Sequence, residues 1–301
     1  MLICDTHADT LYAMQNKARR PEAPLDVTAE RLTGTSDVRV QALALFVGAN
    51  GMRGDDADIV TRELAAFERL KSQGFFQVTE LSQAREGAAN AMLTIEGGEA
   101  FGDDPASVER FAGLGVRAAG LVWNHENRLA QPAKGGSGEG LTPFGREVVF
   151  RMRQCRMAVD VSHLNERGMW ETLDGPVPPM ASHSCARALC DHPRNLTDPQ
   201  LRALFQAGGY VGVNFYPRFL DDSGKADIDR VVDHIAHMCD RGGERCVGLG
   251  SDFDGIDEYP LGLRHAGDVP ALLERMRARG FSEPLVRAVA GENFARYLSA
   301  L

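Results

Sequence analysis

Eight short apolar runs, spaced along most of the chain, are the feature that most limits what this sequence can fold into. They cover residues 2–7, 38–47, 91–96, 115–123, 156–162, 179–183, 208–215 and 246–252. Short, nearly continuous apolar runs are typical of buried parallel strands. Stretches with helical spacing of apolar residues lie between them, at residues 59–70, 144–152, 201–205 and 228–239. This alternation predicts an α/β fold with a parallel sheet.

The number of strand and helix units favours a closed barrel. Eight such units within about 250 residues are what a (β/α)8 TIM barrel requires, and a doubly wound open sheet is the weaker alternative. Three more helices are expected over residues 268–279, 283–290 and 292–299. The 301 residues contain no internal repeat and no convincing linker. We therefore expect residues 1–301 to form one barrel domain.

The charge and composition of the chain exclude several classes of partner. The net charge is -9, whereas nucleic acids and anionic membranes demand a basic face. No run approaches the roughly 20 apolar residues of a membrane helix, and a first strand at residue 2 leaves no room for a signal peptide. The six cysteines form no C-x-x-C pair, which indicates free thiols. We expect a cytoplasmic protein, with a homodimer as a candidate assembly.

Polar patches follow four of the apolar runs within the first 190 residues. Burying histidine or carboxylate groups at such places is costly unless something pairs with them, and a metal ion is the commonest partner for several at once. A single strand-end histidine is more often structural. However, barrels collect the residues at their strand ends at one mouth, so five candidates in register predict a metal site. These candidates are His7, Asp9, Glu96, His163 and His183.

The spacing of the candidates indicates a pair of metal ions. Residues two apart in a strand share a face, so His7 and Asp9 can converge on one ion if the strand continues through them. Glu96 is followed by two glycines, which leave its carboxylate free to bridge two ions. The lysines, at positions 17, 71, 134 and 225, do not end a strand, which excludes a carboxylated-lysine bridge. Zinc suits these ligands, and manganese or cobalt would also fit.

Two residues in the second half of the chain fit hydrolysis of a small anionic substrate. Asp252 ends the eighth run and is a candidate to take a proton from water and pass it to a leaving amine. A turn carboxylate is the alternative reading, for which Asp254 is the better candidate. Arg194 is a candidate to clamp a substrate carboxylate, with a surface salt bridge as the alternative.

Other features give weaker signals. His234 and His237 fall on the polar face of a predicted helix, so we expect both to be solvated. The glycine-rich residues 131–140 follow the fourth run, where they are either an active-site lid or a surface loop. Residues 254–267 follow the eighth run and are expected to form a second wall of the pocket.

Taken together, these patches resemble the membrane (renal) dipeptidase family of binuclear zinc peptidases, which are amidohydrolase-like barrels. The similarity covers residues 5–9, 95–98, 140–145, 159–163, 182–184, 194–195, 213–216, 250–255 and 291–294. The resemblance implies one zinc ion held by His7, Asp9 and Glu96. It implies a second zinc ion held by Glu96, His163 and His183.

On the substrate side, the chain departs from the family at one position. Many members carry a histidine in a Leu-Thr-His run, proposed to touch the substrate, where this chain has Trp123. Trp123 cannot accept a proton or donate like an imidazole, and His125 would share its face if the strand continued. The motif at residues 213–216 makes Asn214 and Tyr216 further candidates for substrate binding.

The resemblance implies a metallo-dipeptidase that often tolerates a D-residue at the C-terminal position of its substrate. In this reading, a metal-bound hydroxide attacks the peptide carbonyl, Asp252 transfers the proton, and Arg194 binds the substrate carboxylate. A second enzyme hypothesis is an amidohydrolase acting on N-acyl amino acids or lactones. A hypothesis of another class is a dipeptide-binding barrel that has lost turnover through the change at Trp123.

Overall fold

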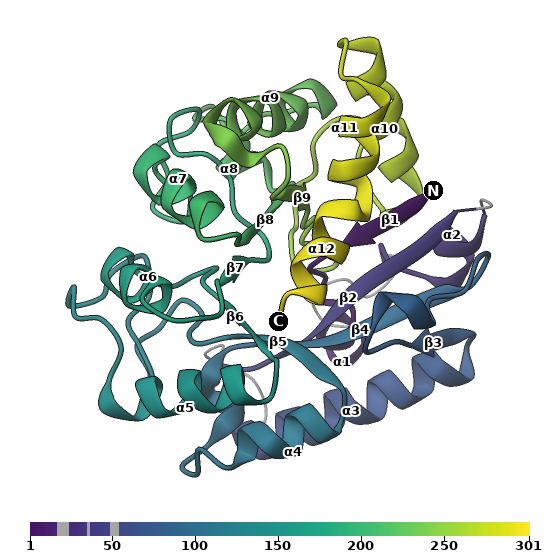
Figure 1. The fold of residues 1–301 in the computed structure, drawn as a ribbon. Helices are drawn as coiled ribbons and strands as arrows, with labels where there is room; N and C mark the ends of the chain where they lie inside the picture. Colours follow the sequence, from purple (N-terminus) through teal and green to yellow (C-terminus); the bar gives the residue numbers. More distant parts are fainter. Residues whose placement is uncertain (17–23, 35–36, 49–53) are drawn as a thin grey trace.

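Eight parallel strands form a closed barrel with helices around it (Figure 1). The computed structural model describes residues 1–16, 24–34, 37–48 and 54–301. Neighbouring strands follow the order β2-β1-β9-β8-β7-β6-β5-β4, and pairing of β2 with β4 closes the ring. The (β/α)8 prediction is therefore confirmed, and the doubly wound alternative is wrong. The barrel strands are β1 (Leu2–Asp5), β2 (Val38–Phe46), β4 (Ala89–Glu96), β5 (Val116–Gly120), β6 (Ala158–Asp160), β7 (Met180–Ala181), β8 (Tyr210–Val213) and β9 (Val247–Leu249).

One further strand was not expected from the sequence. β3 (Phe75–Gln77) pairs with the start of β4, from Ala89 to Ala91. β5 joins the same edge of β4 further along, where Leu93 pairs with Val116, because β2 occupies the other edge. Three residues are too few to produce a recognisable apolar run, which explains why the sequence pattern did not predict β3.

Helices lie between the strands at most of the predicted positions. The regions of α3, α5, α7, α9, α10, α11 and α12 were expected, whereas α1, α2, α4, α6 and α8 were not. Most of the unexpected helices are only one or two turns long, so they give little periodic signal. The helices are α1 (Thr10–Gln15), α2 (Ala29–Thr33), α3 (Asp56–Ser72), α4 (Ser107–Gly113), α5 (Pro143–Gln154), α6 (Glu166–Leu173), α7 (Asp198–Gln206), α8 (Pro217–Leu220), α9 (Ile228–Met238), α10 (Val269–Ala278), α11 (Glu283–Arg287) and α12 (Asn293–Ser299).

Side-chain caps fix where several helices begin. Thr142 accepts a hydrogen bond from the backbone of Gly145 at the start of α5. Thr197 and Gln200 form a reciprocal capping box at the start of α7, and Asn165 caps α6 in a similar way. Each such cap contributes about 1 kcal/mol. The caps anchor each helix directly after the loop that leaves the preceding strand.

One end of the barrel interior is filled by side chains. A buried cluster combines Cys4 of β1, Met92 of β4 and Tyr210 of β8 with residues of most other strands. Phe294 and Tyr297 of α12 belong to this cluster, and Figure 1 shows α12 lying in front of the barrel strands. The remaining opening is the end at which the strands terminate, where the polar patches of the sequence lie.

The environment of His234 differs from the expectation. Its side chain is buried, Nδ1 accepts a hydrogen bond from the Ala186 backbone at 3.1 Å, and Nε2 lies 2.9 Å from the Leu220 carbonyl oxygen. The prediction of a solvated residue is wrong because the loop after β7 and helix α8 cover a helix face that periodicity assigned to water. His237 is partly exposed and lies 2.7 Å from Asp198.

All six cysteines are free thiols, as expected. Within the described parts of the chain, none of the helices has the length and apolarity that crossing a bilayer would require.

Candidate active site

A cavity of about 500 Å³ opens at the mouth of the barrel where the strands end. Seven predicted site residues line it directly: Asp9, Glu96, Trp123, His125, His163, Tyr216 and Asp252. The remaining lining residues come from the end of a strand and from the loops and short helices that follow strands, which is the usual place for the site of a TIM barrel. They are Tyr12, Phe46, Asn124, Phe219, Gly255, Ile256 and Asp257.

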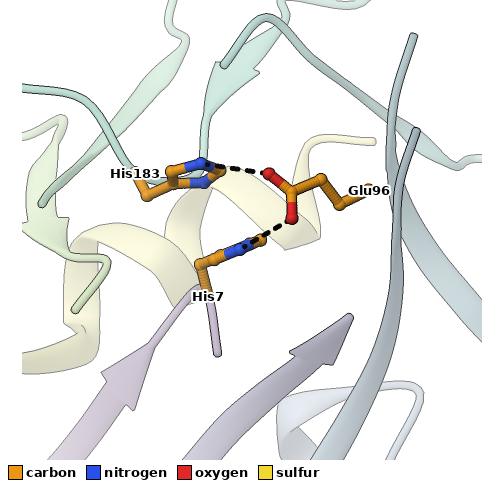
Figure 2. Close-up of side chains that lie close together, drawn as sticks. All are labelled: His7, Glu96 and His183. Carbon is orange, nitrogen blue, oxygen red and sulfur yellow. Dashed lines mark ion pairs between the residues drawn. The ribbon is translucent and has the colours of Figure 1, made fainter. Parts of the chain in front are cut away.

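One carboxylate oxygen of Glu96 faces His7, and the other faces His163 and His183. Figure 2 shows the contacts with His7 and His183. Its Oε2 lies 3.5 Å from Nε2 of His7. Its Oε1 lies 2.9 Å from Nε2 of His163 and 3.5 Å from Nε2 of His183. This arrangement is the one expected of a carboxylate that serves two neighbouring cations.

Two glycines allow the chain to turn directly after Glu96. Glu96 is the last residue of β4 and pairs with Phe46 at the end of β2. A Cβ on Gly97 would lie 2.1 Å from the carbonyl oxygen of Val47, and the residue has a φ of +96°. A Cβ on Gly98 would lie 2.3 Å from the carbonyl oxygen of Leu121. Only glycine permits such close approach of the strand ends.

His7 and Asp9 converge as expected. Strand β1 ends at Asp5, but the parallel pairing resumes at Ala8, which forms a bridge with Phe253, so His7 and Asp9 flank a paired residue. Nε2 of His7 lies 3.8 Å from Oδ1 of Asp9 and 3.8 Å from Oδ1 of Asp252. A Cβ on Gly255 would lie 2.2 Å from Asp9 Oδ2 and 2.6 Å from Asp252 Oδ1, so its missing side chain makes room for both carboxylates. We call His7, Asp9 and Asp252 the carboxylate half of the site.

His163 and His183 form the second group, which we call the imidazole half. Their Nε2 atoms are 3.1 Å apart. Nδ1 of His163 donates to Oδ1 of Asn124 at 2.9 Å. Nδ1 of His183 donates to Oγ of Ser182 at 2.7 Å, and that hydroxyl donates to the carboxylate of Asp160. Because each Nδ1 carries the proton, each Nε2 presents its lone pair toward Glu96.

Sequence reasoning assigned no role to Asn124, Ser182 or Asp160. Ser182 and Asp160 belong to patches that the sequence had singled out, so their position beside the candidate histidines was an available signal. Asn124 lies between Trp123 and His125, but no spacing rule connects it to His163. Its contact depends on how two separate loops meet.

The carboxylate half concentrates charge. Burial alone would lower the pKa of His7, but the charge of Glu96 and the contacts with Asp9 outweigh it and hold that pKa well above the usual value. Burial and the charge of Glu96 raise the pKa of Asp9 to about 6. Burial also raises the pKa of Asp252, to about 7, against the opposing charge of His7. The carboxylates of Asp9 and Asp252 therefore resist ionisation unless a cation offsets their charge.

The imidazole half is neutral. Burial, followed by the charge of Arg194, lowers the pKa of His163 to about 4. Burial and the charge of His7 hold the pKa of His183 well below its ordinary value. Burial opposes ionisation of Glu96, yet the charge of His7 keeps its pKa well below the usual range. Neutral imidazoles beside an ionised carboxylate are the protonation states that a metal requires.

The donor set fits a bound cation. Among the residues that the structure describes, Nε2 of His7 and Oδ1 of Asp9 are buried without a hydrogen-bond partner, a costly state unless another species satisfies them. Donor atoms of His7, Glu96 and His183 lie within 4.8 Å of one another, as do those of His7, Asp9 and Asp252. Histidine nitrogen and carboxylate oxygen are ligands that zinc accepts.

Arg194 is buried beside this cluster. Its Nη2 donates to the carbonyl oxygen of His183 at 3.4 Å, and its guanidinium lies 5.6 Å from the ring centre of Phe219. Within the described part of the chain, its buried Nε has no hydrogen-bond partner. The alternative of a surface salt bridge is wrong, because the side chain is only 6% exposed. A buried guanidinium with an unused donor is suited to an anionic group.

Asn214 lies behind Asp252 rather than on the cavity wall. It is fully buried, and its Nδ2 donates to Oδ2 of Asp252 at 3.0 Å. Its own Oδ1 accepts from the backbone of Tyr216 at 2.6 Å. The structure therefore differs from the expectation of a substrate contact by Asn214, whereas Tyr216 does line the cavity.

Trp123 and His125 both line the cavity, although β5 ends before them at Gly120. The rings of Trp123 and Phe46 pack edge to face with their centres 5.1 Å apart, and those of Phe46 and Tyr12 pack in the same way with their centres 4.9 Å apart. We call Tyr12, Phe46 and Trp123 the aromatic wall. The ring centres of Trp123 and His125 are 5.8 Å apart, so the two residues are neighbours on one rim.

The two loops expected near the site have different outcomes. Gly255, Ile256 and Asp257 contribute to the cavity, so the segment after β9 forms part of its wall, as expected. The glycine-rich residues 131–140 instead lie beside α6, where Asn165 donates to the Glu139 carbonyl oxygen at 2.7 Å. They line a separate hollow of about 920 Å³, which agrees with the surface-loop alternative.

Asp254 holds the loop after β9 in place from a buried position. It accepts hydrogen bonds from the Thr10 hydroxyl and from the backbone of Asp26, each at 2.7 Å. Two residues of this loop have left-handed backbone conformations, Asp252 with a φ of 66° and Asp254 with a φ of 65°. The candidate ligand His163 has one as well, with a φ of 68°. Left-handed conformations of non-glycine residues cost roughly 1–3 kcal/mol and cluster at functional sites.

Comparisons with known proteins give a consistent result. A family model described as membrane dipeptidase (peptidase family M19) matches residues 1–301. The uncharacterized protein in the pqqA 5' region of Klebsiella pneumoniae is 36% identical over 263 residues, covering 81% of this chain and 97% of that protein. An uncharacterized dipeptidase of Schizosaccharomyces pombe is 40% identical over 212 residues, covering 69% of this chain and 52% of that protein. The chain thus spans about half the length of the yeast relative.

Among solved structures, a metallo peptidase from Rhodobacter sphaeroides is similar over almost its whole length. It is 27% identical, with a TM-score of 0.87, and the match covers 99% of each chain. That protein was crystallised with a phosphinate mimic of the dipeptide L-Ala-D-Ala.

Proposed function

Because the chain belongs to the membrane dipeptidase family, peptidase family M19, we propose that it is a metallo-dipeptidase that hydrolyses the single peptide bond of dipeptides. The observation that carries this proposal is the Glu96 carboxylate, which faces His7 with one oxygen and His163 and His183 with the other. This cluster borders a cavity of about 500 Å³, a volume in the range of small-molecule sites.

The proposed cofactor is a pair of zinc ions. His7 and Asp9 would hold one, His163 and His183 the other, with Glu96 shared between them. The unpartnered Nε2 of His7 and Oδ1 of Asp9 support this assignment, and manganese or cobalt would fit the same donors. Bound metal at such a site activates water as a nucleophile and polarises a carbonyl oxygen.

Asp252 is the proposed proton carrier. As the water oxygen bonds to the peptide carbonyl carbon, Asp252 accepts a proton from that water. As the C–N bond breaks, Asp252 returns the proton to the departing nitrogen, so that an amine and a carboxylic acid are formed, and the acid then loses its proton to the amine. The hydrogen bond from Asn214, at 3.0 Å, holds the carboxylate in one orientation and makes Asn214 a positioning residue.

Arg194 is proposed to bind the substrate carboxylate. Its burial and its unused Nε favour a strong, charge-assisted hydrogen bond. Trp123, His125 and Tyr216 line the cavity and are proposed to contact the rest of the dipeptide. The L-Ala-D-Ala mimic held by the Rhodobacter sphaeroides protein supports a D-residue at the C-terminal position. We also propose that residues 1–301 form one catalytic domain, and the six free thiols support a reducing cytoplasm as its location.

The test is hydrolysis of a dipeptide panel by protein loaded with zinc and checked for bound metal. We expect release of free amino acids from L-Xaa-L-Xaa or L-Xaa-D-Xaa dipeptides, and no release after chelation. N-acyl-D-amino acids and lactones in the same assay test the amidohydrolase alternative. Dipeptides that raise the melting temperature of the metal-loaded protein without being cleaved would instead favour the binding-protein alternative.

A further inference from the structure

One residue of the cavity rim reaches the metal-binding cluster from outside. Asn124 follows β5 on the loop that also carries Trp123 and His125, and its side chain is exposed in the cavity. Its Oδ1 lies 2.9 Å from Nδ1 of His163. The opposite nitrogen of that ring, Nε2, lies 2.9 Å from Glu96. The imidazole of His163 is thus held between the rim of the cavity and the carboxylate at its centre.

This hydrogen bond fixes two properties of His163. An amide oxygen only accepts hydrogen bonds, so Nδ1 must carry the proton and Nε2 must present a lone pair. The second torsion of a histidine side chain is broad, so a partner on Nδ1 also fixes the orientation of the ring. The rings of Trp123 and His163 are 6.1 Å apart and tilted by 38°, a packing contact that does not select a tautomer.

His163 and His183 obtain their Nδ1 partners from different parts of the fold. With a φ of 68°, His163 lies in the left-handed region, outside any helix or strand, and such a strained conformation persists only where the surrounding structure holds it. The Nδ1 of the nearby His183 has its own partner, the hydroxyl of Ser182, which is the preceding residue in the chain. His163 depends instead on a loop from another strand.

We propose that Asn124 is a positioning residue, which presents Nε2 of His163 for metal binding. The inference rests on the proposed metal centre and adds a residue to it. Partners of this kind orient metal-bound histidines in general, and their loss costs about 10–100-fold in metal affinity. Asn124 acts through His163 and need not touch either the metal or the reacting atoms.

The experiment compares three variants of the full-length protein. Asn124→Leu keeps a similar volume but has no acceptor, Asn124→Asp restores an acceptor, and Glu126→Leu places leucine at another exposed position of the same loop. Each protein is loaded with zinc and dialysed against increasing concentrations of a chelator, and the zinc retained per chain is measured by elemental analysis. Melting temperatures are recorded with and without metal.

We expect Asn124→Leu to lose one zinc equivalent at a chelator activity about tenfold or more below that required for the wild type. Asn124→Asp should retain both equivalents, and Glu126→Leu should match the wild type. The metal-free melting temperature should be similar in all four proteins, whereas the rise on zinc binding should be smaller for Asn124→Leu.

Two results would overturn the inference. Wild-type retention of zinc by Asn124→Leu would show that His163 needs no such partner. An equal drop in the melting temperature of metal-free and metal-loaded Asn124→Leu would show that Asn124 only supports its loop. If the wild type itself binds no zinc, the metal centre of the proposed function fails instead, and the two failures are therefore distinguishable.

Discussion

The two halves of the candidate site are prepared for a cation in different ways. In the carboxylate half, His7, Asp9 and Asp252 crowd together, and buried donor atoms lack partners among the described residues. In the imidazole half, each ring is neutral and is oriented from behind, His163 by Asn124 and His183 by Ser182. One half is arranged by charge and the other by hydrogen bonds. Glu96 is the residue that both halves share.

Removing the charge of Glu96 should disable metal binding in both halves of the site. Glu96→Gln keeps the size of the side chain, but its amide nitrogen cannot bind a cation and would face one set of imidazoles. We expect both metal equivalents to be lost or strongly weakened and kcat/KM for a dipeptide to fall by about a thousandfold or more. Elemental analysis and steady-state kinetics measure the two effects.

The neighbouring Glu99→Gln variant serves as a matched control, since Glu99 lies three residues further along and belongs to neither group of candidate metal-binding donors. If Glu96→Gln retained two tightly bound equivalents, Glu96 would not be the shared ligand, and the division of the site into two halves would have to be redrawn.

Removing the support of His183 should weaken the imidazole half alone. Ser182→Ala leaves Nδ1 of His183 and the carboxylate of Asp160 without their shared hydroxyl, in a place where water has little access. We expect about a hundredfold weaker binding of one zinc equivalent and a loss of about 1–3 kcal/mol in the free energy of unfolding. Chelator titration and denaturant unfolding measure these changes.

The effect of Ser182→Ala should exceed that of Asn124→Leu, because the relay behind His183 ends in a buried carboxylate, whereas Asn124 is a neutral amide at the rim. Equal effects of the two variants would mean that the charge of Asp160 adds nothing to the basicity of the ring.

Changing the pH should separate the two halves without mutation. His7 has a raised pKa and is protonated near neutrality, and the pKa values of Asp9 and Asp252 are raised to about 6 and about 7. A metal must displace these protons, so its apparent affinity for the carboxylate half should rise by about tenfold per pH unit for each proton released. His163 and His183 have lowered pKa values, so the imidazole half should change little between about pH 6 and pH 8.

Competition titrations with a zinc indicator at several pH values resolve the two equivalents. Parallel pH dependence of both equivalents would contradict the proposed difference in protonation. Calorimetry in buffers of different ionisation enthalpy provides a second measurement, because it counts the protons released on binding.

The aromatic wall should affect the substrate and neither half of the metal cluster. Trp123→Leu removes the edge-to-face contact with Phe46 and part of the cavity surface. We expect kcat/KM for dipeptides with a bulky apolar side chain to fall by about tenfold or less, with retention of zinc unchanged. A uniform loss across all dipeptides would assign Trp123 to the reaction itself, and a loss of zinc would assign it to the support of His163.

The strands and the candidate ligands could be predicted because each depends on a local pattern. An apolar run followed by a histidine or carboxylate needs no knowledge of its neighbours, and parallel strands bring such ends together. His7 and Asp9 converge because the parallel pairing of β1 resumes at Ala8, which forms a bridge with Phe253. Arg194 and Asp252 lie beside the cluster, as their position after strands had indicated.

The remaining features depend on contacts between distant segments. Asn124 meets His163 across 39 positions of sequence, and a single asparagine in a loop carries no periodic signal. His234 was assigned to solvent by helical periodicity, yet it is buried because other segments cover that face of α9. Asn214 supports Asp252 from behind, a role that its place in a motif cannot distinguish from substrate binding.

Gly255 has a consequence for how variants of this protein would be interpreted. It carries no chemistry, and its φ lies outside the left-handed region, so a substitution table would rate alanine there as harmless. The added methyl group would nevertheless occupy the space between Asp9 Oδ2, at 2.2 Å, and Asp252 Oδ1, at 2.6 Å. A genetic map of tolerated substitutions should therefore place Gly255 among the least tolerant positions, beside the residues whose side chains it has left room for.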